Sequence, residues 1–362
     1  MIHSTVLLLH ESCGNTILVM LRSQRPLSLA ELTDILDPIG VPLSAAELTG
    51  GTFSSVQSVE LADGRTVVVK TSVPDAEDHA ALLTYEHDLA RVEADMLSLL
   101  GPVEGVPSAP LLLEDFSRSR VEVDVIVSGL LPGTPWDRAG ALAPDATAEA
   151  ARSVGSIFAR LHGLTGSSFG YPAAGFALGG PTWEVAFDAI LRAHVADAER
   201  WSVDVRAPEL LSLLARGEAA LAEVTTACLV HNDLWPGNVL LDPASGTVVG
   251  IVDLERALYG DQLLDFVGMN PFNVAALSAH HVEGYLAAGG TLPLDASAGT
   301  ATGLSPAADQ RVALYRLSLL TVMLVEAVPR GFSGNWLGPH LELTADTRDR
   351  VMTYALATFP AA

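Results

Sequence analysis

The sequence LVHNDLWPGNVLLD, residues 229–242, constrains the fold of this chain more than any other stretch. It places a histidine, two amides and a carboxylate in one short loop between apolar runs that we expect to be strands. A turn requires only one or two such polar residues. Asp233 and Asn238 lie five positions apart, and Asn238 leads directly into the second apolar run. The loop is therefore predicted to carry chemistry as well as to reverse the chain.

A predicted hairpin brings a further carboxylate to this loop. The segment DPASG, residues 242–246, has the composition of a tight turn and lies between two short apolar strands. Because a hairpin brings the outer ends of its strands together, we expect Asn238 and Asp253 to be neighbours. Amide and carboxylate oxygens are hard ligands suited to Mg²⁺. Asp233 would then lie near the metal, where it could accept the proton of an attacking hydroxyl group.

The order of these residues is that of a kinase catalytic loop. The pattern D-x-x-x-x-N, from Asp233 to Asn238, is followed fifteen residues later by Asp253. Each residue alone would more often form a turn or a cap, so the prediction depends on all three together. We expect His231 to be a packed, hydrogen-bonded residue that ties the loop to neighbouring backbone.

The N-terminal part of the chain contains a candidate phosphate-covering turn. Its sequence is GGTFSS, residues 50–55, and it precedes a predicted strand over residues 56–61. The two glycines alone also fit an ordinary turn. The sequence contains no G-x-x-x-x-G-K-[ST] loop, which excludes a Walker-type nucleotide site.

Lys70 is the candidate ligand of the nucleotide phosphates. It ends a second predicted strand, residues 65–70, where a lysine could equally protect a sheet edge. Apolar residues at spacings of three and four predict a helix over residues 79–100. This helix carries Glu86 and Glu93, either of which could pair with Lys70. We favour Glu93 because it lies deeper in the apolar pattern.

Composition limits the class of protein. A chain of 362 residues, 49% hydrophobic and 17% charged, can bury a large interior and is long enough for two lobes. The net charge of −23 argues against a nucleic-acid partner; it fits a cationic substrate, and it equally fits ordinary solubility. With only two cysteines, Cys13 and Cys228, a disulfide framework is excluded, which favours a cytoplasmic location.

No secretion signal or membrane span is predicted. The apolar run at the N-terminus has no basic segment before it and is interrupted by the polar residues 10–12. Residues 312–328 come closest to a membrane span. Because they contain Arg316 and Glu326, we expect a buried helix there instead.

These motifs resemble those of the aminoglycoside phosphotransferase, choline kinase and fructosamine kinase superfamily, which has a protein-kinase-like fold. The similarity runs from about residue 45 to about residue 330. HNDLWPGN, residues 231–238, stands at the family's H-G-D-x-x-x-x-N, with Asn232 in place of glycine as in choline kinases. VDLE, residues 252–255, stands at the metal motif I-D-[WF]-[EG]. The G-D-P…D-L segment that follows is matched at residues 260–265, except that Gln262 replaces the proline.

The resemblance implies an α+β, bilobal protein-kinase-like fold. It has a small β-rich N-lobe and a larger helical C-lobe with an inserted β-hairpin. The expected division of the chain is an N-terminal extension over residues 1–25, an N-lobe over 26–128, a hinge over 129–133 and a C-lobe over 134–362.

The resemblance also implies ATP and Mg²⁺ as cofactors and a role for each matching residue. Asp233 would be the catalytic base, while Asn238 and Asp253 would hold Mg²⁺. Lys70 would bind the α- and β-phosphates and be oriented by Glu93. The other nucleotide contacts would come from the phosphate-covering turn and the hinge, at Gly51, Ser54, Ser55, Ser128 and Leu130.

The expected reaction transfers the γ-phosphoryl group of ATP to a hydroxyl group of a small molecule. An aminoglycoside-like or amino-sugar acceptor is favoured, because an acidic and aromatic wall would bind an amine. The candidate wall residues are Trp235, Glu255, Asp261 and Trp183, although the tryptophans could equally be core residues and the acids solvated. A ketosamine (fructosamine) or choline-type acceptor is the alternative.

Two other classes of protein fit less well. A nucleotide-binding pseudokinase would commonly lack the base, the metal ligand or the lysine, whereas Asp233, Asp253 and Lys70 are all present. A protein kinase would need an Ala-Pro-Glu segment after an activation loop, and the sequence lacks it there. We expect no nucleic-acid or membrane partner, and either a monomer or a homodimer.

Overall fold

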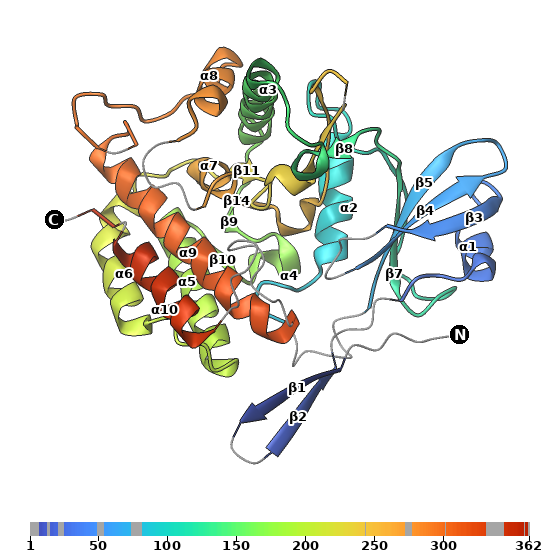
Figure 1. Ribbon diagram of the computed structural model, residues 1–362, viewed down its shortest axis with the longest axis horizontal. Coiled ribbons are helices and arrows are strands. Elements are labelled where there is room, and N and C mark those ends of the chain that lie inside the picture. The colour runs from blue at the N-terminus through green and yellow to red at the C-terminus, as the bar shows by residue number, and fades with distance from the viewer. Residues whose placement is uncertain are drawn as a thin grey trace.

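The computed structural model describes residues 7–12, 15–20, 25–48, 54–73, 82–242, 244–271, 277–300, 302–330, 344–357 and 359–360. Their fold is α+β, with a five-stranded antiparallel sheet beside a larger, mainly helical part (Figure 1). This architecture confirms the fold class expected from the sequence. A hairpin of β1 (Leu7–Ser12) and β2 (Asn15–Met20) forms a separate two-stranded sheet.

The five-stranded sheet has the strand order β3-β4-β5-β7-β6. Its strands are β3 (Pro42–Glu47), β4 (Ser55–Leu61), β5 (Thr66–Ser72), β6 (Leu111–Asp115) and β7 (Asp124–Gly129). β4 and β5 form where the sequence predicts two strands, and they pair as a hairpin around the Asp63-Gly64 turn.

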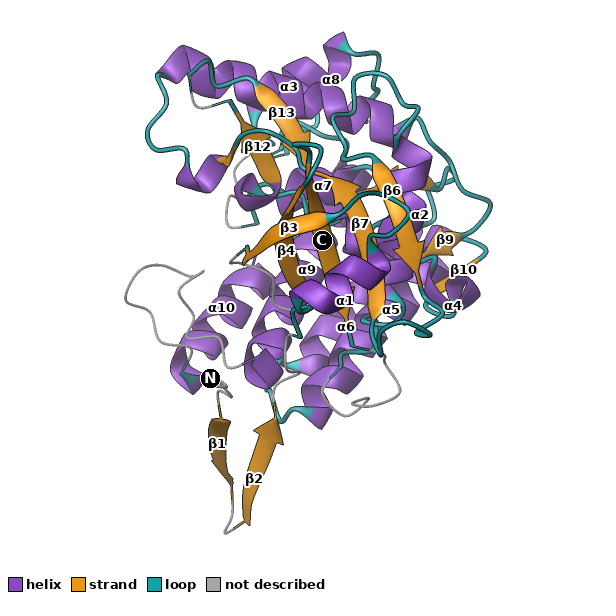
Figure 2. Ribbon diagram, turned by 90° about the vertical axis from the view of Figure 1, so that its right-hand side faces the viewer, coloured by secondary structure: helices purple, strands orange, loops and turns teal. Residues whose placement is uncertain are grey.

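Alternation along β5 gives the sheet a core face and a cleft face. Val67 and Val69 are buried in a core that they share with α1 (Leu29–Ile35). Because successive strand residues point to opposite faces, Val68 and Lys70 project from the other face. Figure 2 shows α1 lying across the outer side of the sheet, so the face that carries Lys70 is the one turned toward the helical part.

Two elements of this part differ from the sequence-based prediction. The helix predicted from residue 79 is α2 (Leu89–Leu100); residues 82–88 form turns, and residues 74–81 lie outside the described chain. Asp88, just before α2, has a left-handed backbone (φ 54°), which is incompatible with an earlier helical turn. β3 was not predicted because Pro42 is its only buried residue, so the strand lacks an alternating apolar pattern.

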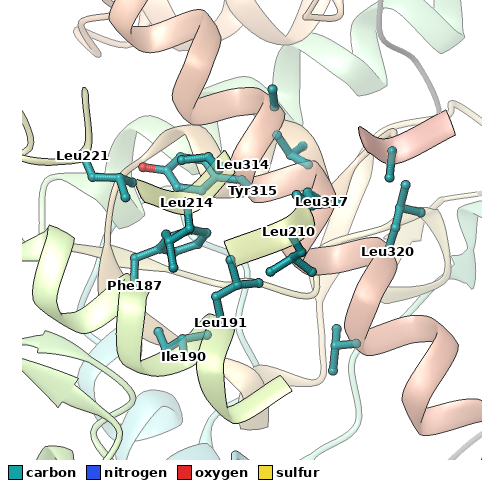
Figure 3. Close-up of a cluster of buried hydrophobic side chains, with 14 of the residues drawn as sticks. Phe187, Ile190, Leu191, Leu210, Leu214, Leu221, Leu314, Tyr315, Leu317 and Leu320 are labelled. Atoms are coloured by element: carbon teal, nitrogen blue, oxygen red, sulfur yellow. The ribbon is translucent and has the colours of Figure 1, made fainter. Parts of the chain in front are cut away.

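The helical part is built around three long helices. These are α5 (Trp183–Arg200), α6 (Ala207–Leu221) and α9 (Pro306–Arg330). Figure 3 shows their leucines, with Phe187 and Tyr315, meeting in one buried cluster. The other helices are α3 (Pro144–His162), α4 (Ala173–Phe176), α7 (Leu263–Gly268), α8 (Ala279–Ala287) and α10 (Ala345–Ala357).

α9 is the only helix of the described chain that is long and apolar enough to cross a membrane. Its most apolar window is 78% buried inside the protein, between α5, α6 and α10. The structure therefore agrees with the buried helix expected around residues 312–328.

Short strands carry the loops of the helical part. β11 (Cys228–Val230) and β14 (Leu258–Gly260) pair with each other in a sheet completed by β9 (Phe169–Gly170) and β10 (Gly179–Gly180). The predicted hairpin is β12 (Val239–Leu241) and β13 (Val248–Ile251), and β8 (Thr134–Pro135) pairs with β12. Single 3₁₀ turns cover residues Trp136–Arg138 (η2), Pro236–Asn238 (η3) and Leu254–Arg256 (η4).

Candidate active site

A cleft of about 550 Å³ lies between the five-stranded sheet and the helical part. Its walls come from β4, β5, β7, α2, the catalytic loop, the β12–β13 hairpin and the end of α9. It contains ten of the residues that the sequence assigned to a site, namely Ser54, Lys70, Glu93, Ser128, Leu130, Asp233, Trp235, Asn238, Asp253 and Glu255. Lys70 and Glu255, which are 185 positions apart in the chain, thus meet in one cavity.

The catalytic loop is held from behind by a buried carboxylate. Asp265, on α7, accepts hydrogen bonds from the backbone N–H groups of His231 (3.1 Å) and Asn232 (2.9 Å). The ring of His231 contacts the carbonyl oxygen of Val252 at 3.2 Å, which ties the loop to the end of the hairpin as expected. Asn232 has φ 61°, a left-handed conformation that asparagine tolerates better than most residues. These bonds fix the backbone that presents Asp233.

The hairpin brings Asn238 and Asp253 together. The backbone N–H of Val252 donates to the carbonyl oxygen of Asn238 at 3.1 Å, one residue before Asp253. The side-chain amide of Asn238 donates to the carbonyl oxygen of Asp233 at 2.8 Å. The amide oxygen of Asn238 is thereby left for another partner, and the side chain of Asp253 is 38% exposed. This pair of hard oxygen donors fits Mg²⁺.

Lys70 is the cationic centre of the cleft. Its ammonium nitrogen lies 2.6 Å from Glu93, 2.9 Å from Asp253 and 2.7 Å from Glu255. Burial lowers the pKa of Lys70, but the three carboxylates outweigh it and raise the pKa well above its usual value. Burial also raises the pKa of Glu255, to about 8, against the attraction of Lys70. Lys70 is therefore charged, and it is the only lysine in the chain.

Glu93 is the helical partner of Lys70, and Glu86 is not. Glu93 lies on the inner side of α2 and is buried. Glu86 precedes α2, is 1% exposed, and pairs with the guanidinium group of Arg330. The choice of Glu93 was therefore right, but its place within α2 distinguishes it, because Glu86 is the more buried of the two.

Asp233 lies in a low-dielectric position beside an arginine. Burial raises its pKa to about 7, and Arg256, whose Nη1 lies 3.7 Å from Oδ1, opposes this shift. Arg256 is held in turn by Glu326 at 3.1 Å and by the hydroxyl group of Tyr85. The Tyr85 ring also packs under this guanidinium group, 4.8 Å from its carbon. The cleft thus places a partly buried carboxylate of raised pKa close to a lysine and a pair of metal-type oxygens.

Comparison with known proteins agrees with this geometry. Residues 46–300 match the sequence model of the phosphotransferase enzyme family. The chain belongs to this family. The phosphotransferase is accordingly a small-molecule kinase-type enzyme with a kinase-like fold. A search of curated protein sequences finds no match.

Solved structures similar to this phosphotransferase have the same fold at low sequence identity. One is a thermostable mutant of aminoglycoside phosphotransferase APH(4)-Ia with AMP-PNP and hygromycin B (TM-score 0.58, 16% identity, 91% of this chain and 98% of that chain). Another is a candidate fructosamine-3-kinase from Thermobifida fusca (TM-score 0.59, 20% identity, 92% and 98%). A third is a candidate aminoglycoside phosphotransferase from Ralstonia eutropha (TM-score 0.58, 15% identity, 92% and 97%).

Two residues expected in the acceptor wall of the phosphotransferase lie in its interior, and those predictions are wrong. Trp183 is 0% exposed, and its indole N–H donates to the hydroxyl group of Tyr315 at 2.7 Å. Asp261 is 4% exposed and accepts hydrogen bonds from Arg311 and Tyr315, both at 2.8 Å. Both side chains belong to the packing between α5, α9 and the loop before α7.

Of the other residues expected to contact nucleotide or acceptor in the phosphotransferase, some line the cleft and others do not. Glu255 lines the cleft but faces Lys70, so it is on the nucleotide side rather than the acceptor side. Trp235 is 44% exposed and lines the cleft. Ser54 lines it as well, whereas Ser55 is buried and is not among its lining residues. Gly51 lies outside the described residues.

Sequence reasoning missed four charged residues among the described lining of the phosphotransferase cleft, namely Arg138, Arg256, Glu326 and Arg330. Arg256 had a usable signal, because it follows Asp253 by three positions and a 3₁₀ turn places residues i and i+3 on the same side. Glu326 and Arg330 had none, since nothing local indicates that the end of α9 reaches the catalytic loop.

Proposed function

We propose that this protein transfers the γ-phosphoryl group of ATP to a hydroxyl group of a small molecule, with Mg²⁺ as cofactor. The observation that carries the proposal is the convergence of Asp233, the Asn238–Asp253 pair and the Lys70–Glu93 ion pair on one cleft. The complexes of related structures with AMP-PNP and with ADP support the use of a nucleotide.

The chain's own groups divide the reaction between them. Lys70, on β5, neutralises nucleotide phosphates, and Glu93, on α2, holds its ammonium group in place. Asp233 accepts the proton as the acceptor oxygen bonds to phosphorus and the bond to the ADP oxygen breaks. Asn238 and Asp253 would hold Mg²⁺, which when bound neutralises charge on the phosphate oxygens. With little covalent work to do, the protein contributes mainly positioning and charge stabilisation.

An amine-bearing acceptor is the first candidate suggested by the sequence. The hygromycin B complexes of related structures and the exposed Trp235 support it, and the similar structure of a candidate fructosamine-3-kinase supports a ketosamine as the alternative. Two of the carboxylates expected to bind the amine, Glu255 and Asp261, have other partners in the structure. The charge of the acceptor is therefore a separate question from the chemistry of transfer.

Substitution of the base and the metal ligand tests the proposed function. Asp233→Asn and Asp253→Asn should each lose at least about 100-fold in ADP release with any active acceptor, in line with the loss of a general base or metal ligand. Asp233→Asn should retain binding of Mg²⁺–AMP-PNP, measured by calorimetry, whereas Asp253→Asn should weaken it. Asp188→Asn, on α5 and paired with Arg192, is the matched control and should behave as wild type. Near-wild-type turnover in either site variant would refute the assignment.

A further inference from the structure

The wall of the cleft beyond Asp233 consists mainly of paired charges. Arg256, Glu326 and Arg330 line it, with side chains only 12%, 14% and 10% exposed. They come from η4 and from the end of α9, so they are fixed by tertiary packing rather than by a surface loop.

Glu326 has no free negative charge to offer a ligand. Its Oε2 atom lies 3.1 Å from Nη2 of Arg256 and 3.5 Å from Nη1 of Arg330. The same atom accepts a hydrogen bond from the hydroxyl group of Tyr85 at 3.3 Å. Two guanidinium groups therefore compensate this one carboxylate.

Each of the other carboxylates in or beside this wall also has a cationic neighbour, although Glu93, Asp253 and Glu255 share the single charge of Lys70. Glu86 is 1% exposed and is bound by Arg330 and by the backbone N–H of Leu83. Among the described residues that line the cleft, every carboxylate lies within 4 Å of a cationic group; these pairs are Glu93, Asp253 and Glu255 with Lys70, Asp233 with Arg256, and Glu326 with both arginines.

We propose that the acceptor is an uncharged, hydroxyl-rich molecule, such as a sugar or polyol without ammonium groups, and that Arg256 and Arg330 exclude polycations as built-in counter-ions. The inference rests on the proposed function, because it places the acceptor hydroxyl beside Asp233. An entering ammonium group would have to displace a guanidinium group, which stays protonated, from an ion pair that is largely shielded from water.

Hydroxyl groups meet no such barrier on this wall. They can accept hydrogen bonds from guanidinium N–H groups and donate to carboxylate oxygens without displacing either. Trp235, 44% exposed at the rim, supplies an apolar face for the C–H side of a sugar ring. The wall is thus complementary to a neutral polyol.

Matched pairs of acceptors test the proposal on the wild-type protein. Glucose is compared with glucosamine, and myo-inositol with the diamine 2-deoxystreptamine, by calorimetry on protein saturated with Mg²⁺–AMP-PNP. The neutral member of at least one pair should bind about tenfold or more tightly than its amine counterpart. ADP release with ATP should show the same preference.

A variant tests the arginine directly. Arg330→Gln removes one counter-ion from Glu86 and Glu326, so it should reduce the preference for the neutral member by about tenfold or more. Arg192→Gln, which breaks an exposed pair with Asp188 on α5, is the matched control and should leave the preference unchanged. A folded Arg330→Gln protein with wild-type preference would overturn the role of Arg330.

The outcomes distinguish failure of the neutral-acceptor proposal from failure of the proposed ATP-dependent transfer. Equal or tighter binding of the amine member in both pairs overturns the neutral acceptor, and so does the failure of both polyols to bind, while ATP-dependent chemistry stands. Failure of the wild-type protein to bind Mg²⁺–AMP-PNP is seen before any acceptor is added, and it overturns the proposed function together with the inference.

Discussion

Asp233 is the residue whose protonation state should control the reaction. Its pKa is raised to about 7 by burial, and a carboxyl group accepts a proton only when it is ionised. Activity should therefore be lost as the pH falls through about 7, and it should be retained above that value. The acid limb of kcat/KM for ATP, which reports the nucleotide-free enzyme, measures this pKa. An acid limb near the ordinary value of about 4 would contradict the prediction.

Arg256 should set the pH at which the acid limb of kcat/KM lies. Its positive charge, 3.7 Å from Asp233, favours the ionised carboxylate and so lowers the pKa from what burial alone would give. Arg256→Gln should therefore move the acid limb to higher pH, by about one unit for each 1.4 kcal/mol of attraction lost. Arg256→Lys keeps the charge and should shift the limb less. An identical pH profile for the glutamine variant and the wild type would show that the pair does not influence Asp233.

For individual residues, the sequence predicted local motifs but not the direction of side chains. The sequence identified Asn238 and Asp253 as neighbours because one short hairpin joins them, and β-pairing is determined locally there. It misplaced Trp183 because the burial of that side chain depends on Tyr315, 132 residues further along the chain. An aromatic or acidic residue near a motif has no local feature that distinguishes a cleft position from a core position.

At the scale of elements, α3 and α8 pack unusually closely. A Cβ atom on Gly155 of α3 would lie 2.0 Å from the backbone oxygen of His281, and one on Gly284 of α8 would lie 2.0 Å from that of Arg152. The two glycines therefore permit direct backbone contact between helices that cover one side of the catalytic loop's supporting core.

Gly155→Ala should destabilise the protein even though alanine is the better helix former. The added methyl group meets backbone, which cannot rotate away, so we expect a loss of about 2 kcal/mol in the free energy of unfolding. Gly268→Ala, on α7 with nothing within 4 Å of its Cβ position, is the matched control and should be neutral or stabilising by about 0.5 kcal/mol. Denaturant unfolding measures both. Equal stability of the two variants would mean that α3 and α8 can move apart freely.

The predictability of an element depended on how much of its pattern was local. α1 has a local signal at its start, because Ser28 and Glu31 form a capping box there. α9 was recognised as a buried helix because its apolar run contains Arg316 and Glu326, yet nothing in its sequence located its end beside Asp233. β3 escaped notice because it pairs through backbone while exposing most of its side chains.

For the molecule as a whole, the single lysine makes the nucleotide site chemically unique. An acyl-phosphate derivative of ATP should acylate Lys70, because binding brings the reactive group to the only side-chain amine of the protein. Excess ATP should protect it. A matched acyl phosphate without the nucleotide should react poorly, since no binding holds it beside an amine that three carboxylates keep mostly protonated. Peptide mass spectrometry that finds label only on the N-terminal amine would contradict the assignment of the cleft.

Because Lys70 is the only lysine, the occupancy of the cleft can be measured in a simple way. A protease that cuts only after lysine can divide the denatured chain at one bond, giving fragments 1–70 and 71–362. An acylated Lys70 is no longer a cleavage point, so the proportion of full-length chain on a gel counts the molecules whose cleft held the reagent. Ligand competition for this protein can therefore be quantified by band intensity, before any acceptor has been identified.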